Sequence, residues 1–256
     1  MKQKILFMMI DMNVGGTEKA FLNLVSEIDF TKYDVTLLLL EEKGGFLKDV
    51  PNEVQIETLE NYEQIKDEIM LPPLVCAKKA MHIKKYLKAV GILFYHIIFK
   101  ISNDRTSYYK YIIRKLKKKE GYDVAIAFAG PMEFITTYIL EKVEANKKIQ
   151  WIHFDISKNG TNLKHARRNY PKFNKIFVVS DQAKQILIDA IPSIDKITET
   201  KQNVVSEAAC LKLAEVGETY RNYDGIKILT VGRLYREKGQ DIIPEVARQL
   251  KKEGYD

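Results

Sequence analysis

The segment VGRLYREKGQDIIPEVARQL, from Val231 to Leu250, places several cations in a turn that precedes a predicted helix. Arg233 brings a planar guanidinium fork and Lys238 a point charge, with one glycine before and one after the turn. The N–H groups and dipole at a helix N-terminus attract anions. Two interpretations stay open: the pair forms an anion-binding turn, or both are solvated loop cations like Arg236.

A histidine near the end of an apolar run is the second candidate. The segment WIHFD, residues 151–155, places His153 at the end of a predicted strand, and the carboxyl ends of parallel strands point into the ligand crevice. The alternative is a structural histidine that is hydrogen-bonded within the fold. Because His82, His96 and His165 share no metal-ligand spacing with it, we expect no metal site.

The third candidate is a pair of glycines between a strand and a helix. Gly15 and Gly16 follow the apolar run Ile5–Ile10 and precede a helical pattern from about Thr17 to Ile28. The pair either exposes backbone N–H groups to a ligand or forms a tight turn that requires positive φ. The absence of GxGxxG argues against a dinucleotide cofactor.

Apolar runs of strand length alternate with segments of helical period, and this pattern predicts where the candidates lie. It indicates an α/β fold class with a Rossmann-like, mostly parallel sheet, because each run is continuous enough to be buried on both faces. The predicted strands are Ile5–Ile10, Asp34–Leu40, Val54–Leu59, Asp123–Phe128, Ile149–Phe154 and Lys175–Ser180.

The domain organisation follows from a polar stretch late in the chain. We predict a first domain over residues 1–205, a connection over residues 206–225, and the start of a second domain over residues 226–256. The second domain is expected to begin with a strand at Ile226–Val231 and a helix with an apolar stripe.

An insertion over residues 71–120 separates the third and fourth predicted strands. It contains two helical stretches rich in lysine, tyrosine and isoleucine, CAKKAMHIKKYLKAVGILFYHIIFKI and SYYKYIIRKLKKKEG. The insertion is either a core helix pair with solvated basic faces or a peripheral contact with an anionic membrane. Val90–Phe99 is strongly apolar but too short to cross a bilayer. Nucleic acid is not an expected partner, because no recognition helix or stacking signature is present.

Composition sets the remaining limits. The chain has 256 residues, 46% of them hydrophobic, and a formal net charge of +7, which suits phosphorylated ligands as well as anionic surfaces. Its two cysteines, Cys76 and Cys210, are far apart and indicate neither a disulfide framework nor a zinc site. A reducing cytoplasm is therefore the simplest setting. The N-terminus MKQKILFMMID is predicted to be a strand rather than a signal peptide.

Four segments together resemble one family. DMNVGGTEKAFLNLVSEI, WIHFD, FVVSDQAKQIL and VGRLYREKGQD are similar to bacterial retaining glycosyltransferases of the capsular and exopolysaccharide type, the family of sucrose-phosphate synthase and phosphatidylinositol mannosyltransferase. The resemblance covers nearly the whole chain. It implies the GT-B architecture, in which two Rossmann-like domains face each other across the active site. The first domain binds the acceptor and the second binds the nucleotide-sugar donor.

The same resemblance implies roles for the candidate residues. His153 would contact the transferred sugar, Gly15 and Gly16 would lie at the cleft, and Arg233 and Lys238 would hold the donor diphosphate. Cations there stabilise the charge that develops on the diphosphate as the glycosidic bond breaks. No cofactor is implied.

The implied activity is transfer of a hexosyl unit from a nucleotide-sugar to a saccharide or lipid-linked acceptor in cell-surface polysaccharide synthesis. The family's donor-binding glutamates would lie beyond Asp256, so the resemblance implies a chain truncated in its second domain and inactive as it stands. Two alternatives remain: a sugar-nucleotide epimerase of similar build, and a non-catalytic module that binds a membrane or a partner.

Overall fold

The computed structural model describes residues 1–130, 133–158, 160–216, 226–232, 234 and 238–255. The chain divides into two compact units, Met1–Glu207 and Ala208–Asp256. Each unit is described by itself below. Arg233 and Arg236, in the predicted anion-binding turn, lie outside the described residues.

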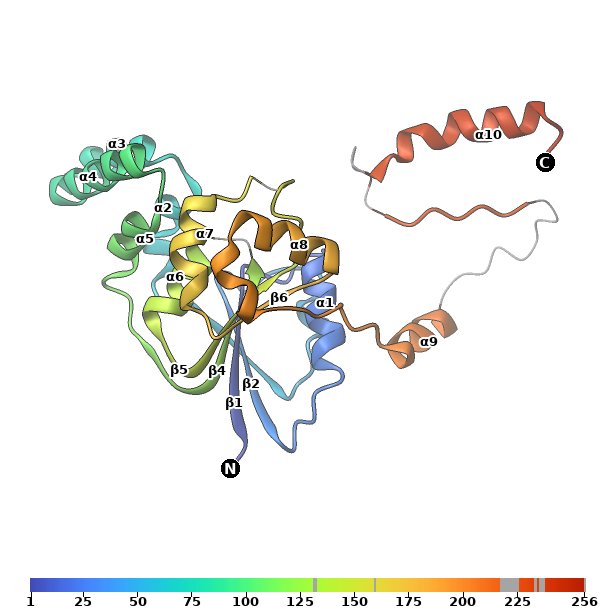
Figure 1. Ribbon diagram of the computed structural model, residues 1–256, viewed down its shortest axis with the longest axis horizontal. Helices are drawn as coiled ribbons and strands as arrows, with labels where there is room; N and C mark the ends of the chain where they lie inside the picture. Colours follow the sequence, from blue (N-terminus) through green and yellow to red (C-terminus); the bar gives the residue numbers. More distant parts are fainter. Residues whose placement is uncertain (131–132, 159, 217–225, 233, 235–237, 256) are drawn as a thin grey trace. The chain divides into compact units, whose positions relative to one another are not determined.

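The first unit is built on one seven-stranded sheet in which every neighbouring pair of strands is parallel (Figure 1). The strand order is β3-β2-β1-β4-β5-β6-β7. The predicted α/β class with a Rossmann-like parallel sheet is therefore confirmed. The strands are β1 (Gln3–Met9), β2 (Tyr33–Leu39), β3 (Val54–Thr58), β4 (Lys119–Gly130), β5 (Val143–Ile152), β6 (Lys175–Val178) and β7 (Thr198–Thr200).

Helices connect these strands. The α-helices of the first unit are α1 (Gly16–Val25), α2 (Lys66–Met70), α3 (Pro73–His82), α4 (Tyr86–Ser102), α5 (Thr106–Ile113), α6 (Glu133–Lys142), α7 (Leu163–Asn169) and α8 (Asp181–Ala190). Short 3₁₀ turns occupy Leu47–Asp49, Tyr62–Gln64, Tyr170–Lys172 and Pro192–Ile197.

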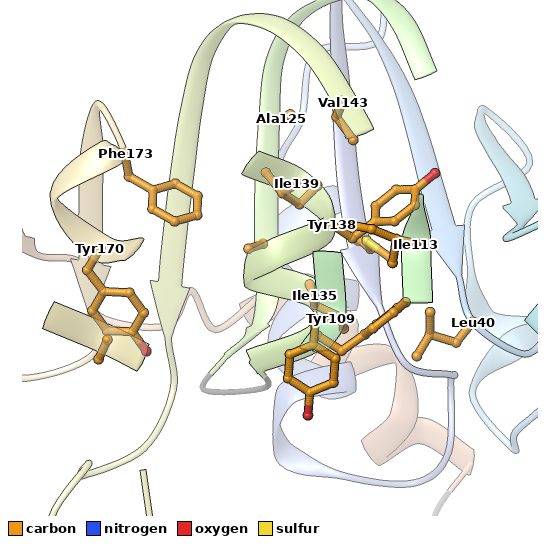
Figure 2. Packing of buried hydrophobic residues seen from close by; sticks show 14 of the residues in the cluster. Leu40, Tyr109, Ile113, Ala125, Ile135, Tyr138, Ile139, Val143, Tyr170 and Phe173 are labelled. Atoms are coloured by element: carbon orange, nitrogen blue, oxygen red, sulfur yellow. The ribbon is translucent and has the colours of Figure 1, made fainter. Parts of the chain in front are cut away.

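The strands bury both faces, which explains their continuous apolar runs. In β1, Leu6 and Met8 pack into one core while Phe7 and Met9 pack into another on the opposite face. The first core lies under α5 and α6, and Figure 2 shows Tyr138 and other side chains of this cluster packed together. The second core lies under α1, where the rings of Phe7, Phe21 and Phe128 meet edge to face at centroid distances of 5.4–5.8 Å.

Three features of the first unit differ from the sequence predictions. The strand β7 was not predicted, because Thr198–Thr200 is short and carries no apolar run. The strands β4 and β5 begin earlier than predicted, and β4 includes Lys119 and Glu120, which were assigned to the insertion. The first helical stretch of the insertion is two helices, because the chain turns between α3 and α4, where Lys84 has φ 58°.

The second unit also corrects the sequence analysis. The helix α9 (Glu207–Val216) lies within the predicted connection over residues 206–225, where good helix formers such as Ala and Leu are frequent. Residues Ile226–Val231, predicted to be a strand, belong to no sheet. A strand needs a hydrogen-bonding neighbour, and the described residues of this unit include no other strand. The expected helix is present as α10 (Ile243–Lys252), preceded by a 3₁₀ turn at Gln240–Ile242.

Candidate functional site

The carboxyl edge of the sheet contains a topological switch point. β1 lies between β2 and β4, and the helices that follow β1 and β4 cover opposite faces, since α1 belongs to one core and α6 to the other. In open α/β sheets, ligands bind outside the strand ends at such a point. Gly15 and Gly16 follow β1, and His153 follows β5, so the structure places these predicted site residues at the same edge.

The loop after β1 is held by its own side chains and by the next loop. The carboxylate of Asp11 accepts hydrogen bonds from the backbone N–H of Asn13 at 3.0 Å and from its Nδ2 at 2.7 Å. Gly44, in the loop after β2, has φ 122°, and a Cβ there would lie 2.0 Å from the carbonyl carbon of Met12. Gly44 is thus required for the two loops to pack. Gly44 was not among the site residues predicted from sequence, although the second Gly-Gly pair, in EEKGGF, indicates a turn at this position.

The glycines of the first loop have a different role from the tight turn considered above. Neither has positive φ, and Gly15, the N-cap of α1, is extended with φ −154°. A Cβ at Gly15 would meet only the flexible carboxylate of Glu18, and a Cβ at Gly16 would meet nothing within 4 Å. Backbone strain and crowding therefore do not explain the pair. Gly16 leaves open space at the start of α1, whereas the carboxylate of Glu18 lies beside Gly15.

His153 lies on the α1 face of the sheet in an aromatic setting. Its ring is parallel to that of Trp151, at an interplanar angle of 3° and a centroid distance of 5.8 Å, and lies 4.4 Å from the ring of Phe128. The side chains at positions 151 and 153 share a face because strand residues alternate. The aromatic neighbours therefore fix the plane of the imidazole.

Both ring nitrogens of His153 are buried, and neither has a hydrogen-bond partner among the described residues; the same is true of Nε1 of Trp151. Burial lowers the pKa of His153 to about 4, although the side chain of Asn203 and the backbone of Phe128 oppose this shift weakly. These two groups approach the ring without reaching hydrogen-bond geometry. His153 is thus neutral at pH 7, with one ring nitrogen that donates and one that accepts.

A second polar group lies on the opposite face, where α5, α6 and α7 meet. Nε2 of His165 lies 3.0 Å from Oγ1 of Thr137, and Nδ2 of Asn169 donates to Oγ1 of Thr106 at 2.7 Å. The Thr106 hydroxyl in turn donates to the carboxylate of Asp104 at 2.6 Å. Burial lowers the pKa of His165 to about 4. This network is internally hydrogen-bonded and stabilises the contact between the three helices.

Glu133, in the first turn of α6, lies beside this network but has a carboxylate oxygen that the network does not satisfy. Burial raises the pKa of its carboxyl group to about 7, while the charge of Arg105 opposes the rise. Its Oε2 is buried and has no hydrogen-bond partner among the described residues. The sequence analysis missed Glu133, because an acidic residue in the first turn of a helix is ordinary and carries no signal.

In the second unit, Lys238 is exposed and precedes Gly239, which has φ 62°. Nε2 of Gln240 donates to the carbonyl of Gly232 at 3.3 Å. The predicted partner of Lys238, Arg233, lies outside the described residues, so the proposed cation pair remains a prediction.

Within the described part of the chain, no three His, Cys, Asp or Glu side chains are grouped as a metal-ligand set. Cys76 and Cys210 are both free thiols. None of the helices in the described ranges combines the length and apolar character needed to cross a membrane.

No family model matches the chain, and no curated protein matches it. Among solved structures, the chain is similar to Anabaena Alr3699/HepE in complex with UDP and glucose, at 14% identity and a TM-score of 0.45, over 84% of this chain and 50% of that one. It is also similar to HepE in complex with UDP, at 15% identity and a TM-score of 0.43, over the same shares. The chain spans about half the length of the structures it matches. Similarity at this level does not assign a function.

Proposed function

We propose that this chain is part of a retaining hexosyltransferase of the GT-B architecture, which uses a nucleotide-sugar donor, and that its first unit is the acceptor-side domain. The observation that carries the proposal is His153, a half-buried neutral imidazole at the carboxyl end of β5, whose two buried ring nitrogens have no hydrogen-bond partner among the described residues. Buried polar groups are nearly always hydrogen-bonded, so nitrogens left unbonded by the protein indicate a bound ligand as their partner.

The chemistry of the site suits sugar recognition. A neutral imidazole donates to one hydroxyl and accepts from another, and the rings of Trp151 and Phe128 fix its orientation. His153 would position the transferred sugar near its reacting carbon. The backbone N–H of Gly16, where a Cβ would meet nothing within 4 Å, would face the same crevice from the start of α1, and Gly15 precedes it.

The leaving group requires cations from the second unit. Arg233 and Lys238 would hold the donor diphosphate and stabilise the charge that develops on it as the glycosidic bond breaks. In this proposal residues 1–205 form the acceptor-side domain, and residues 226–256 belong to the donor-side domain. The acceptor is a saccharide or a lipid-linked saccharide used for cell-surface polysaccharide on the cytoplasmic side of the membrane.

The test uses the whole protein, because the proposed reaction needs both an acceptor-side and a donor-side domain. Purified protein is offered a panel of nucleotide-sugars, and donor hydrolysis, transfer and the anomeric configuration of the product are followed. Arg233→Ala and Lys238→Ala should each lower turnover by one to three orders of magnitude, in line with loss of a charged transition-state contact of about 2–4 kcal/mol.

Arg236→Ala is the matched control and should leave turnover nearly unchanged. Equal small effects at all three positions would show that these cations are solvated and hold no diphosphate. Release of an epimerised sugar without any transfer would indicate that the protein is an epimerase of similar build and not a transferase.

A further inference from the structure

The helix α4 carries an apolar stripe that the described part of the protein leaves uncovered. Five residues spaced by three and four positions form the stripe, and their exposed fractions range from 57% to 91%. This spacing places them on one face of the helix. The stripe consists of Leu87, Val90, Phe94, Ile97 and Ile101.

The opposite face of α4 is packed firmly against the protein. Ala89 and Ile92 are 2% and 0% exposed, and a Cβ at Gly91 would lie 2.0 Å from the hydroxyl of Tyr111 in α5. The rings of Tyr95 and Tyr111 lie 4.8 Å apart. The helix is therefore fixed with its apolar stripe directed outward.

The surroundings of the stripe are cationic. Residues 69–103 contain six lysines and no aspartate or glutamate. Two of these lysines are paired with carboxylates from α2: Lys79 contacts Asp67 at 3.0 Å, and Lys88 contacts Glu68. Lys78, Lys84, Lys85 and Lys100 form no ion pair with a described carboxylate.

A basic cleft of about 900 Å³ opens beside the stripe, between the start of α4 and the end of α5. The cleft is lined by four cations without an ion-pair partner among the described residues: Lys84, Lys85, Arg114 and Lys115. Glu68 is the one carboxylate among its lining residues, and Lys88 already pairs with it. Leu87 belongs to both the cleft wall and the stripe, so the apolar and cationic surfaces are continuous.

We propose that this surface binds an anionic lipid bilayer, with the stripe of α4 among the acyl chains and the basic cleft around lipid phosphates. α4 has 17 residues, which is about 25 Å of helix, and it would lie in the plane of the interface. Exposed Tyr86 and Phe94 are residue types that favour this depth. The proposal does not depend on glycosyl transfer.

Charge decides between a membrane and a second copy of the chain as the occupant. Two copies that pair through their stripes would bring their own cations together, and like charges oppose such contact. An anionic lipid surface instead complements the charge of both the lysines beside the stripe and the cations of the cleft.

The first measurement is co-sedimentation of the 256-residue chain with vesicles of phosphatidylcholine alone or in equal mixture with phosphatidylglycerol. We expect binding to the anionic vesicles at least tenfold stronger than to the neutral ones. The difference should shrink when salt rises from about 0.1 M to about 0.5 M, because exposed charges are then screened over a shorter distance.

Two pairs of variants separate the cleft from the stripe. K84Q/K85Q/K115Q should weaken binding about a hundredfold, at about fivefold per charge, while K48Q/K164Q/K196Q removes three exposed lysines elsewhere and should change it much less. Leu87→Glu should weaken binding tenfold or more, whereas Leu211→Glu, at an exposed position of α9, should not. All these positions are exposed, so circular dichroism should show every variant folded.

Insertion depth is read from a tryptophan placed in the stripe. In F94W, acyl chains brominated near the headgroup should quench the added indole, while Trp151, which is 9% exposed in the sheet core, should be quenched little and serves as the internal control.

Equal binding to neutral and anionic vesicles, or equal loss in test and control triple variants, would overturn the proposal. A second result would also overturn it. If the wild type is a dimer in sedimentation velocity, Leu87→Glu is a monomer, and neither binds vesicles, then the stripe joins two copies of the chain.

Discussion

Two neutral histidines differ in how their ring nitrogens are hydrogen-bonded. His153 and His165 are both kept neutral by burial, each with a pKa of about 4. His165 is bonded to Thr137 inside a network that joins three helices, whereas His153 has no hydrogen bond from the described residues. A shifted pKa alone therefore does not identify a site; an unbonded nitrogen at a strand's carboxyl end is the more specific sign.

The largest expected effect separates the two histidines by activity. In the whole protein, His153→Ala should lower turnover by about a hundredfold to a thousandfold, the loss measured for a preorganised polar contact to a transition state. Its free energy of unfolding should fall by only about 1 kcal/mol, because the change removes ring contacts with Trp151 and Phe128 but no hydrogen bond to a described residue. Initial rates and denaturant unfolding on the same preparations check both statements. Unchanged turnover would reduce His153 to a packing residue.

The pH dependence of stability tests the polar group where α5, α6 and α7 meet. The pKa of Glu133 is raised to about 7 from 4.5, so the folded protein holds this proton more tightly than the unfolded chain does. That stabilisation is complete below pH 4.5 and is lost as pH rises through 7, amounting to about 3 kcal/mol. Glu133→Gln cannot titrate, so the wild type should lose stability relative to it between pH 5 and pH 8. Parallel stability curves over that range would contradict the raised pKa.

His165→Ala should give the complementary result to His153→Ala. The imidazole is 2% exposed and hydrogen-bonded to Thr137, so its removal leaves a cavity and removes one of the two hydrogen bonds of the Thr137 hydroxyl, which still donates to the carbonyl of Glu133. We expect the free energy of unfolding to fall by about 2 kcal/mol. Transfer activity should stay close to wild type at temperatures well below unfolding. A large fall in kcat with unchanged stability would extend the functional site to the second face of the sheet.

Much of this arrangement could be predicted from sequence, and the failures have physical causes. The continuous apolar runs located six of the seven strands, and the end of the run at residues 149–154 placed His153 at the carboxyl edge. Burial on both faces produces such runs whatever the tertiary contacts. β7 was missed because its pairing with β6 depends on tertiary contact and not on its own residues, and Ile226–Val231 had the residues of a strand but no neighbour.

Features of the site that depend on distant contacts were beyond sequence reasoning. The contacts of the His153 ring with Trp151 and Phe128 link the end of β5 to β4, and Glu133 becomes unusual only because burial raises its pKa. The unbroken helical pattern of residues 76–101 gave no sign of the turn at Lys84, since neither Gly nor Pro stands there. That turn separates α3 from α4 and places Lys84 and Lys85 at the mouth of the basic cleft.

The smallest expected effect concerns the glycines near His153. Gly16 is in helix α1 without positive φ, and a Cβ there meets nothing within 4 Å. Gly16→Ala should therefore raise the free energy of unfolding by about 0.4–1 kcal/mol, through loss of freedom in the unfolded chain.

Gly44→Ala is the contrasting change in the adjoining loop. It should destabilise the protein, because φ is 122° and the added methyl would lie 2.0 Å from the backbone of Met12. If a ligand approaches the start of α1, Gly16→Ala should also raise KM several-fold with kcat nearly unchanged, because the methyl fills space that the ligand uses in both ground and transition states. Thermal unfolding and steady-state kinetics on the two variants separate these effects. A more stable Gly16→Ala with unaltered KM would show that this end of the helix contacts no substrate, leaving His153 to position the sugar from β5 alone.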